Sequence, residues 1–295
     1  MLTIPVTWFL LVGNLQAVEP VVPSSSGAPA VQSRRAGAWL VQETANFRVW
    51  SPIAWKDAAK LPTACEALRR HLRETWLDGV GDDWSPKCEV VIHSTVAEYV
   101  RALGPGSEQS SGCATIEIEP GRVTKRRIDL RCDAADCFDS SLPHELTHVV
   151  VAERFTHRRL PRWADEGMAI LAEPLAKQQR RRTALERSLA IARPFSAAEL
   201  TGLADYPAPQ RHDAFYGQSA SLVAYLIERE SPAKFLEFVE LSTKGTPEQA
   251  LMKVYGVATL RELDRNWRSR LLTPGESAEL LATRVGRITA FRDVD

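Results

Sequence analysis

Five consecutive residues, His144-Glu145-Leu146-Thr147-His148, place an acid between two side chains that commonly bind metal ions. In a helix, side chains four positions apart lie on one face, so both imidazoles can bind the same ion. Glu145 is rotated about 100° from His144 around the helix axis, which directs its carboxylate beside the metal. The spacing therefore predicts a zinc ion held by His144 and His148, with Glu145 as the base that acts on a zinc-bound water.

A catalytic zinc ion needs three protein ligands and an open position, so a third ligand must come from elsewhere in the chain. Glu166 is the preferred candidate, because Pro161 starts a second predicted helix that can pack antiparallel to the first and return this carboxylate. The alternatives are Glu153, which lies more than a turn beyond His148, and Asp165. Asp165 suits a hydrogen bond to a ligand imidazole, or serves only as an acid in the first turn of its helix.

Strands before the motif and helices around and after it are expected to position these residues. Alternating and buried apolar patterns predict strands at 39–51, at 88–94 and on both sides of the turn Pro120-Gly121 within 115–132. Helical spacing and helix-start signals predict helices at 56–77, 96–103, 140–155, 162–173, 176–192, 215–230, 232–242, 247–256 and 259–272. The chain thus changes from mixed structure to helices alone near the motif.

The N-terminal residues form an apolar stretch that ends in a pattern typical of a signal-peptide cleavage site. We expect a signal peptide at 1–17, a disordered linker rich in Pro and Ser at 18–37, one folded domain at 38–273 and a tail at 274–295. The apolar stretch is short for a membrane span, so the sequence predicts export to the periplasm, cell envelope or medium. Retention by an uncleaved N-terminal anchor is the alternative.

Cysteine count and charge limit the functional classes further. Five cysteines in an exported chain predict two disulfides and one free thiol, and Cys132 is expected to pair with Cys137 or with Cys113. Lys and Arg together number 37, as do Asp and Glu, so the formal net charge is zero. Without a basic excess, a nucleic-acid partner is not expected.

Three segments around the motif resemble one family, the gluzincins, and within them the peptidase MA-like domains. They are HELTH at 144–148, LPRWADEGMA at 160–169 and FYGQSASLVAYLIERE at 215–230. A weaker similarity covers 253–272, so the resemblance spans about residues 39–272. It implies an α+β zincin fold like that of thermolysin: a small mixed sheet over the HExxH helix, in an α/β half at 38–155, followed by a helical half at 156–273.

The resemblance also implies site residues and an activity. It implies a Tyr or His that donates a hydrogen bond to the oxyanion, and Tyr216 at the start of a predicted helix is the candidate, with His212 as its competitor. Thermolysin-like enzymes have an Asp four residues after the ligand Glu, where this chain has Ile170. A Gly-x-Met-x-Asn type of motif, which would bind a substrate α-amine, is not found before the histidines.

Motif and resemblance together predict a zinc metallopeptidase with one Zn²⁺ per chain, His144, His148 and Glu166 as ligands, and a peptide or protein as substrate. The alternative is a catalytically inactive zincin-fold protein that acts as a binding or scaffold component of the cell envelope. The sequence leaves the substrate, endo- or exopeptidase action and the oligomeric state open.

Overall fold

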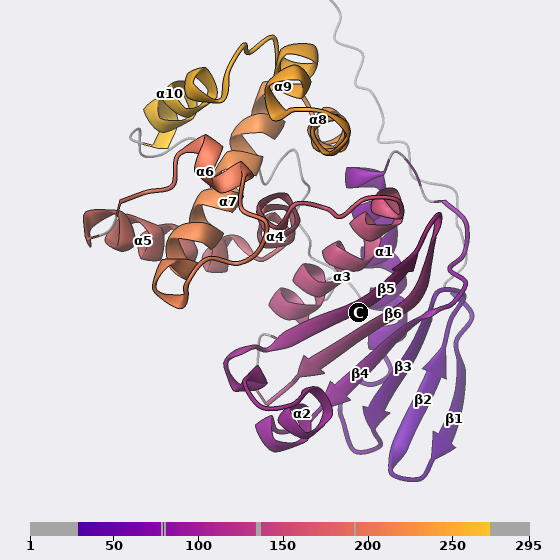
Figure 1. The fold of residues 1–295 in the computed structure, drawn as a ribbon. Helices are drawn as coiled ribbons and strands as arrows, with labels where there is room; N and C mark the ends of the chain where they lie inside the picture. The colour runs from indigo at the N-terminus through magenta and orange to yellow at the C-terminus, as the bar shows by residue number, and fades with distance from the viewer. Residues whose placement is uncertain (1–28, 78, 80, 134–136, 192, 272–295) are drawn as a thin grey trace, which may run out of the picture.

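The computed structural model describes residues 29–77, 79, 81–133, 137–191 and 193–271. The predicted signal peptide at 1–17, the first part of the predicted linker and the predicted tail at 274–295 lie outside these residues. Figure 1 shows a sheet on one side of the molecule and a group of helices on the other. The α+β class is confirmed, and the strands of the sheet precede most of the helices along the chain.

One mixed sheet of six strands, in the order β1-β2-β3-β4-β6-β5, forms the first half (Figure 1). Its strands are β1 (Gln32–Ala36), β2 (Trp39–Glu43), β3 (Phe47–Pro52), β4 (Cys88–His93), β5 (Gly112–Glu119) and β6 (Arg122–Arg131). The central strand β4 is parallel to both of its neighbours, and all other pairs are antiparallel. The tight turn at Pro120-Gly121 joins β5 to β6, as predicted, which leaves β5 as the sheet edge next to the motif.

Strand β1 corrects the prediction of a disordered linker at 18–37. Gln32–Ala36 pairs antiparallel with β2 over its whole length, so the described fold begins before Trp39. The four residues from Gln32 to Arg35 are exposed, and the strand has no apolar face. Because alternating hydrophobicity is the main sequence signal of a strand, a polar edge strand is difficult to predict from sequence.

Two helices of the first half and the motif helix cover the sheet. They are α1 (Leu61–Trp76), α2 (Val96–Leu103) and α3 (Leu142–Val151), and α3 carries the motif. Helix α3 packs on β5 and β6, while α1 packs on β3 and on α3. Figure 1 shows α3 between the sheet and the helical half, so the motif lies at the junction of the two layers.

The second half is helical, as predicted. Its helices are α4 (Arg162–Leu171), α5 (Leu175–Ile191), α6 (Ala197–Thr201), α7 (His212–Arg229), α8 (Pro232–Lys244), α9 (Pro247–Tyr255) and α10 (Leu260–Leu271). The short helix α6 was not predicted; Ser196 and Glu199 form a capping box at its start. Helix α7 packs along α4 and also contacts α5 and α8, so it is the central helix of this half.

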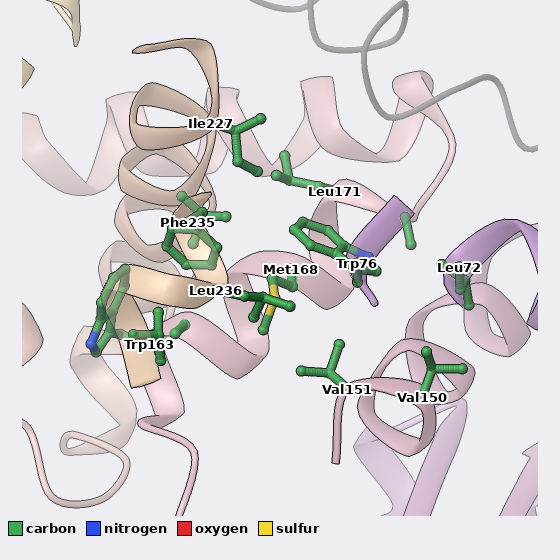
Figure 2. Packing of buried hydrophobic residues seen from close by; sticks show 14 of the residues in the cluster. Leu72, Trp76, Val150, Val151, Trp163, Met168, Leu171, Ile227, Phe235 and Leu236 are labelled. Atoms are coloured by element: carbon green, nitrogen blue, oxygen red, sulfur yellow. The ribbon is translucent and has the colours of Figure 1, made fainter. Parts of the chain in front are cut away.

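A single apolar core connects the two halves. Figure 2 shows where α1, α3, α4, α7 and α8 meet, with Trp76 close to Phe235 and Met168 among them. The ring centroids of Trp76 and Phe235 are 6.5 Å apart, and both side chains are fully buried. The cluster extends from Phe47 on β3 to Trp267 on α10. Burial of this continuous apolar surface holds α3 and α4 against each other, which matters for the site described next.

Of the five cysteines, Cys132 and Cys137 form a disulfide between β6 and α3. This is one of the two pairings proposed from the sequence. Cys65, Cys88 and Cys113 are free thiols, and Cys65 and Cys88 are buried in the core. The structure therefore has one disulfide where the cysteine count predicted two. Among the described residues, none of the helices combines the length and hydrophobicity needed to span a lipid bilayer.

Candidate metal centre

Helices α3 and α4 hold the candidate ligands, and both are positioned by their apolar faces. On α3, Leu146, Val149 and Val150 are fully buried, which turns the two histidines toward the opposite side of the helix. On α4, Gly167 packs against α7 so closely that an added Cβ would lie 2.7 Å from the backbone oxygen of Ser219. The absence of a side chain at position 167 therefore lets α4 and α7 approach each other directly next to Glu166.

The three predicted ligands come together. His144, His148 and Glu166 each offer a ligand atom, and these atoms lie within 4.8 Å of one another. Nε2 of His144 is 3.5 Å from Oε2 of Glu166. Imidazole nitrogens and a carboxylate oxygen form the ligand set of many catalytic zinc sites, so the donor chemistry fits a zinc ion.

Each ligand histidine also has an acidic side chain at its other ring nitrogen. Nδ1 of His148 contacts Oδ1 of Asp165 at 2.6 Å, and Nδ1 of His144 lies 2.9 Å from Oε1 of Glu173. Such contacts leave Nε2 of both rings for a metal, and this arrangement orients ligand imidazoles in known metal sites. Asp165 is therefore not a ligand candidate, and it takes the role of hydrogen-bond partner that the sequence offered.

These acids change the protonation of the metal-free site. Burial alone would lower the pKa of the His148 imidazole, but the nearby Asp165 raises it to about 10. Burial opposes the charge on Glu166 as well, yet His144 and His148 hold its pKa down at about 2. The pKa of His144 is also raised, against the effect of burial, by Glu166 and Glu173. The metal-free centre thus favours protonated histidines beside an ionised Glu166.

Glu173 is a site residue that the sequence analysis missed. Its side chain is fully buried, and Arg181 binds both of its oxygens at 2.7 Å. Lys177 lies 3.3 Å away. Although burial opposes ionisation, Arg181 and His144 lower the pKa of Glu173 to about 2. Glu173 supplies the acid that is absent at Ile170. A signal was present: Glu173 follows Glu166 by seven residues, about two helical turns.

Tyr206 is the second missed residue. It lies in the segment between α6 and the short 3₁₀ turn Pro209–Arg211, and its hydroxyl donates a hydrogen bond of 2.5 Å to Oε1 of Glu166. No periodic pattern or motif marks this loop position in the sequence. The structure alone brings it to the site.

Glu145, the predicted base, faces the same cavity as the three ligand candidates. The cavity measures about 680 Å³, and the edge strand β5 forms one wall while α5 forms another. Gly112, the first residue of β5, lies against Glu145: an added Cβ at this position would come within 2.8 Å of the Glu145 carboxylate. Glu145 is therefore confined between the metal ligands and the start of the edge strand.

The two candidates for the oxyanion donor are placed differently. Tyr216 lines the cavity, and burial together with Glu166 raises the pKa of its phenol to about 12, so the hydroxyl keeps its proton at neutral pH. His212 is not among the residues that line the cavity, and its Nε2 donates to the carbonyl oxygen of Pro207 at 3.0 Å. Geometry thus favours Tyr216 over His212 as a donor to a group in the cavity.

Glu153, the other alternative ligand, points away from the site. Its carboxylate accepts hydrogen bonds from Arg73 on α1 and from the indole of Trp84. These contacts tie the end of the motif helix to the first half of the molecule. Glu153 is therefore excluded as the third ligand in this structure.

Comparison with protein-family models gives a match to the Peptidase MA superfamily over residues 127–273. That segment includes the motif helix, α4 and the whole helical half. Residues 127–273 belong to the Peptidase MA superfamily. The predicted kinship with peptidase MA-like gluzincins is confirmed.

Comparison with solved structures gives weaker likenesses. The chain is similar to a mutant of the M1 zinc metallopeptidase from Deinococcus radiodurans, with 15% identity and a TM-score of 0.43, over 85% of this chain and 54% of that one. A two-domain M1 zinc metallopeptidase mutant bound to L-tryptophan gives 16% identity, a TM-score of 0.43 and the same coverage. The chain spans about half the length of these proteins. A comparison with curated proteins gives no match.

Proposed function

We propose that this Peptidase MA superfamily member is a zinc metallopeptidase that hydrolyses peptide bonds in peptide or protein substrates. The observation that carries the proposal is the convergence of His144, His148 and Glu166 within 4.8 Å, with Glu145 facing the same cavity. Nε2 of each histidine and Oε2 of Glu166 would hold one zinc ion. When bound, the ion supplies polarisation of a water molecule and of the substrate carbonyl.

The side chains of this chain carry the remaining steps. Glu145 accepts the proton of the attacking water and passes it to the leaving amine. Tyr216 donates its hydroxyl proton in a hydrogen bond to the oxygen of the attacked carbonyl, where negative charge develops. Asp165 and Glu173 hold the two imidazoles in orientation, and the walls formed by β5 and α5 keep the substrate beside Glu145.

The test is metal analysis of the purified chain combined with cleavage of a peptide library, with and without a chelator. We expect one zinc per wild-type chain and cleavage that the chelator abolishes. Glu145→Gln is expected to keep the zinc and lose nearly all turnover, because an amide cannot accept the water proton. Glu248→Gln on α9, a change of the same kind outside the cavity, is the control and is expected to leave both unchanged.

Two outcomes would contradict the proposal. Zinc-loaded wild-type protein that cleaves none of the library would favour the alternative, an inactive binding or scaffold protein. Unaltered turnover by Glu145→Gln would remove Glu145 from the role of base. We also propose that the chain is exported, which the Cys132–Cys137 disulfide supports, since such bonds persist in oxidising compartments.

A further inference from the structure

The carboxylate of Glu166 has different partners on its two oxygens. Oε2 lies 3.5 Å from Nε2 of His144, another of the candidate ligands. Oε1 accepts the hydrogen bond of 2.5 Å from the Tyr206 hydroxyl. A glutamate carboxylate turns easily about its last side-chain bond, so without a partner it can offer either oxygen, or both, to an ion. The hydrogen bond from Tyr206 holds Oε1 and so leaves Oε2 as the oxygen available to an ion.

Tyr206 is held in place although 40% of its surface is exposed. Its ring meets that of Phe215 edge to face, with centroids 5.8 Å apart, and the guanidinium of Arg162 lies over it at 5.2 Å. The next residue, Pro207, accepts the hydrogen bond from His212. Contacts from α4 and α7 therefore fix a loop residue at the third ligand.

We propose that Tyr206 is a positioning residue for the metal centre: it fixes Glu166 as a ligand through Oε2 alone, and His212 supports it by holding the loop at Pro207. The inference rests on the proposed zinc site. Loss of a hydrogen bond to a metal ligand typically weakens metal binding by about 10–100-fold. The phenol of Tyr206 is the donor on Oε1, so its removal leaves that oxygen free to turn toward the ion.

Tyr206 and Tyr216 are close, with ring centroids 6.4 Å apart, yet the geometry assigns them different tasks. The Tyr206 proton is already donated to Glu166. The Tyr216 hydroxyl makes no hydrogen bond among the residues that the structure describes, which keeps it available to a substrate. Tyr206→Phe should therefore change metal binding, and Tyr216→Phe should change turnover.

The experiment measures the zinc dissociation constant of the full chain by competition with a chelator for wild type, Tyr206→Phe, Tyr216→Phe and His212→Ala. We expect Tyr206→Phe to raise Kd by about 10-fold or more and His212→Ala to raise it less. Tyr216→Phe, the matched control, should leave Kd unchanged. Thermal melts of the metal-free variants test folding, and Phe is expected to keep the ring packing of Tyr206.

A second readout is the visible absorption spectrum of the cobalt-substituted proteins, which reports the ligands around the ion. Tyr206→Phe is expected to alter this spectrum, and Tyr216→Phe to preserve it. Wild-type Kd and spectrum in Tyr206→Phe would overturn the inference while leaving the proposed function intact. Failure of the wild-type chain to bind zinc at all would instead overturn the metal site on which both rest.

Discussion

At the scale of single residues, the centre places an acidic side chain at Nδ1 of each ligand imidazole, and this has a consequence for metal uptake. In the metal-free protein Asp165 raises the pKa of His148 to about 10 despite burial, and Glu166 and Glu173 raise that of His144. At neutral pH the His148 imidazole is therefore protonated on both nitrogens, and the raised pKa of His144 favours its doubly protonated form as well. A metal binds only the neutral imidazole, so protons must leave when zinc enters.

We predict that zinc binding at pH 7 releases about one to two protons per ion and that the apparent affinity rises with pH. The sign follows from the raised pKa values, because protonated histidine dominates until the pH exceeds them. Calorimetry in two buffers of different ionisation enthalpy counts the protons. Asp165→Asn should release fewer, since it loses the charge that raises the pKa of His148. A binding enthalpy that is the same in both buffers would contradict the prediction.

The sequence predicted those site residues whose spacing or helix-start signals mark them. The two histidines and Glu145 follow from helical spacing, and Glu166 follows from a second helix that starts at Pro161. Tyr206 has no such signal, because its place depends on how a loop is folded against α4 and α7. Glu173 was within reach, since the helix predicted at 162–173 would place it two turns beyond Glu166 on the same face, although α4 itself ends at Leu171.

At the scale of elements, two glycines set how closely the site is packed, and each is next to a different functional acid. Gly112 on β5 lies against the Glu145 carboxylate, whereas Gly167 on α4 lies against the backbone of Ser219 on α7. A side chain can move away from a new methyl group more easily than a helix backbone can. The same substitution should therefore have different results at the two positions.

We predict that Gly112→Ala keeps the fold and the zinc but lowers kcat by about 100-fold. The added methyl group would push the Glu145 carboxylate away from its position beside the metal ligands. Gly167→Ala should destabilise the protein by about 1–3 kcal/mol and weaken zinc binding, because α4 must move away from α7. Urea titration, zinc content and kcat distinguish the two. Val223→Ala removes one of the crowding atoms and should rescue Gly167→Ala only in part, since the Ser219 oxygen remains. Equal stability of all variants would refute the packing argument.

At the scale of the whole molecule, the sheet half and the helical half share one core. Their order along the chain was predictable from the change in hydrophobic period near the motif. The contact between the two halves was not predictable, because Trp76 and Phe235 are far apart in the sequence and nothing in either position's local sequence indicates the other as its neighbour. Strand β1 was not predicted because its residues are exposed and mostly polar, so that only its pairing with β2 defines it as a strand.

We predict that the folded chain unfolds in urea as one unit, with far-UV circular dichroism and tryptophan fluorescence changing together. Trp76→Ala should lower the free energy of unfolding by about 3–5 kcal/mol, because it empties the contact between α1 and α8. Met252→Ala, at a side chain that is 52% exposed, is the control and should change it by less than about 0.5 kcal/mol. Two separate transitions in the wild type would show that the halves are independent.

The three ligand residues come from one short stretch of chain, residues 144–166, which also holds Asp165, whereas Glu173 and Tyr206 come from later in the chain. Bringing the ends of a short segment together costs little chain entropy. During synthesis and folding, the helical hairpin of α3 and α4 can thus capture an ion before Tyr206 and α7 arrive. The ion would then act as a local crosslink that guides the order of assembly, with the later contacts converting a loose complex into a tight one.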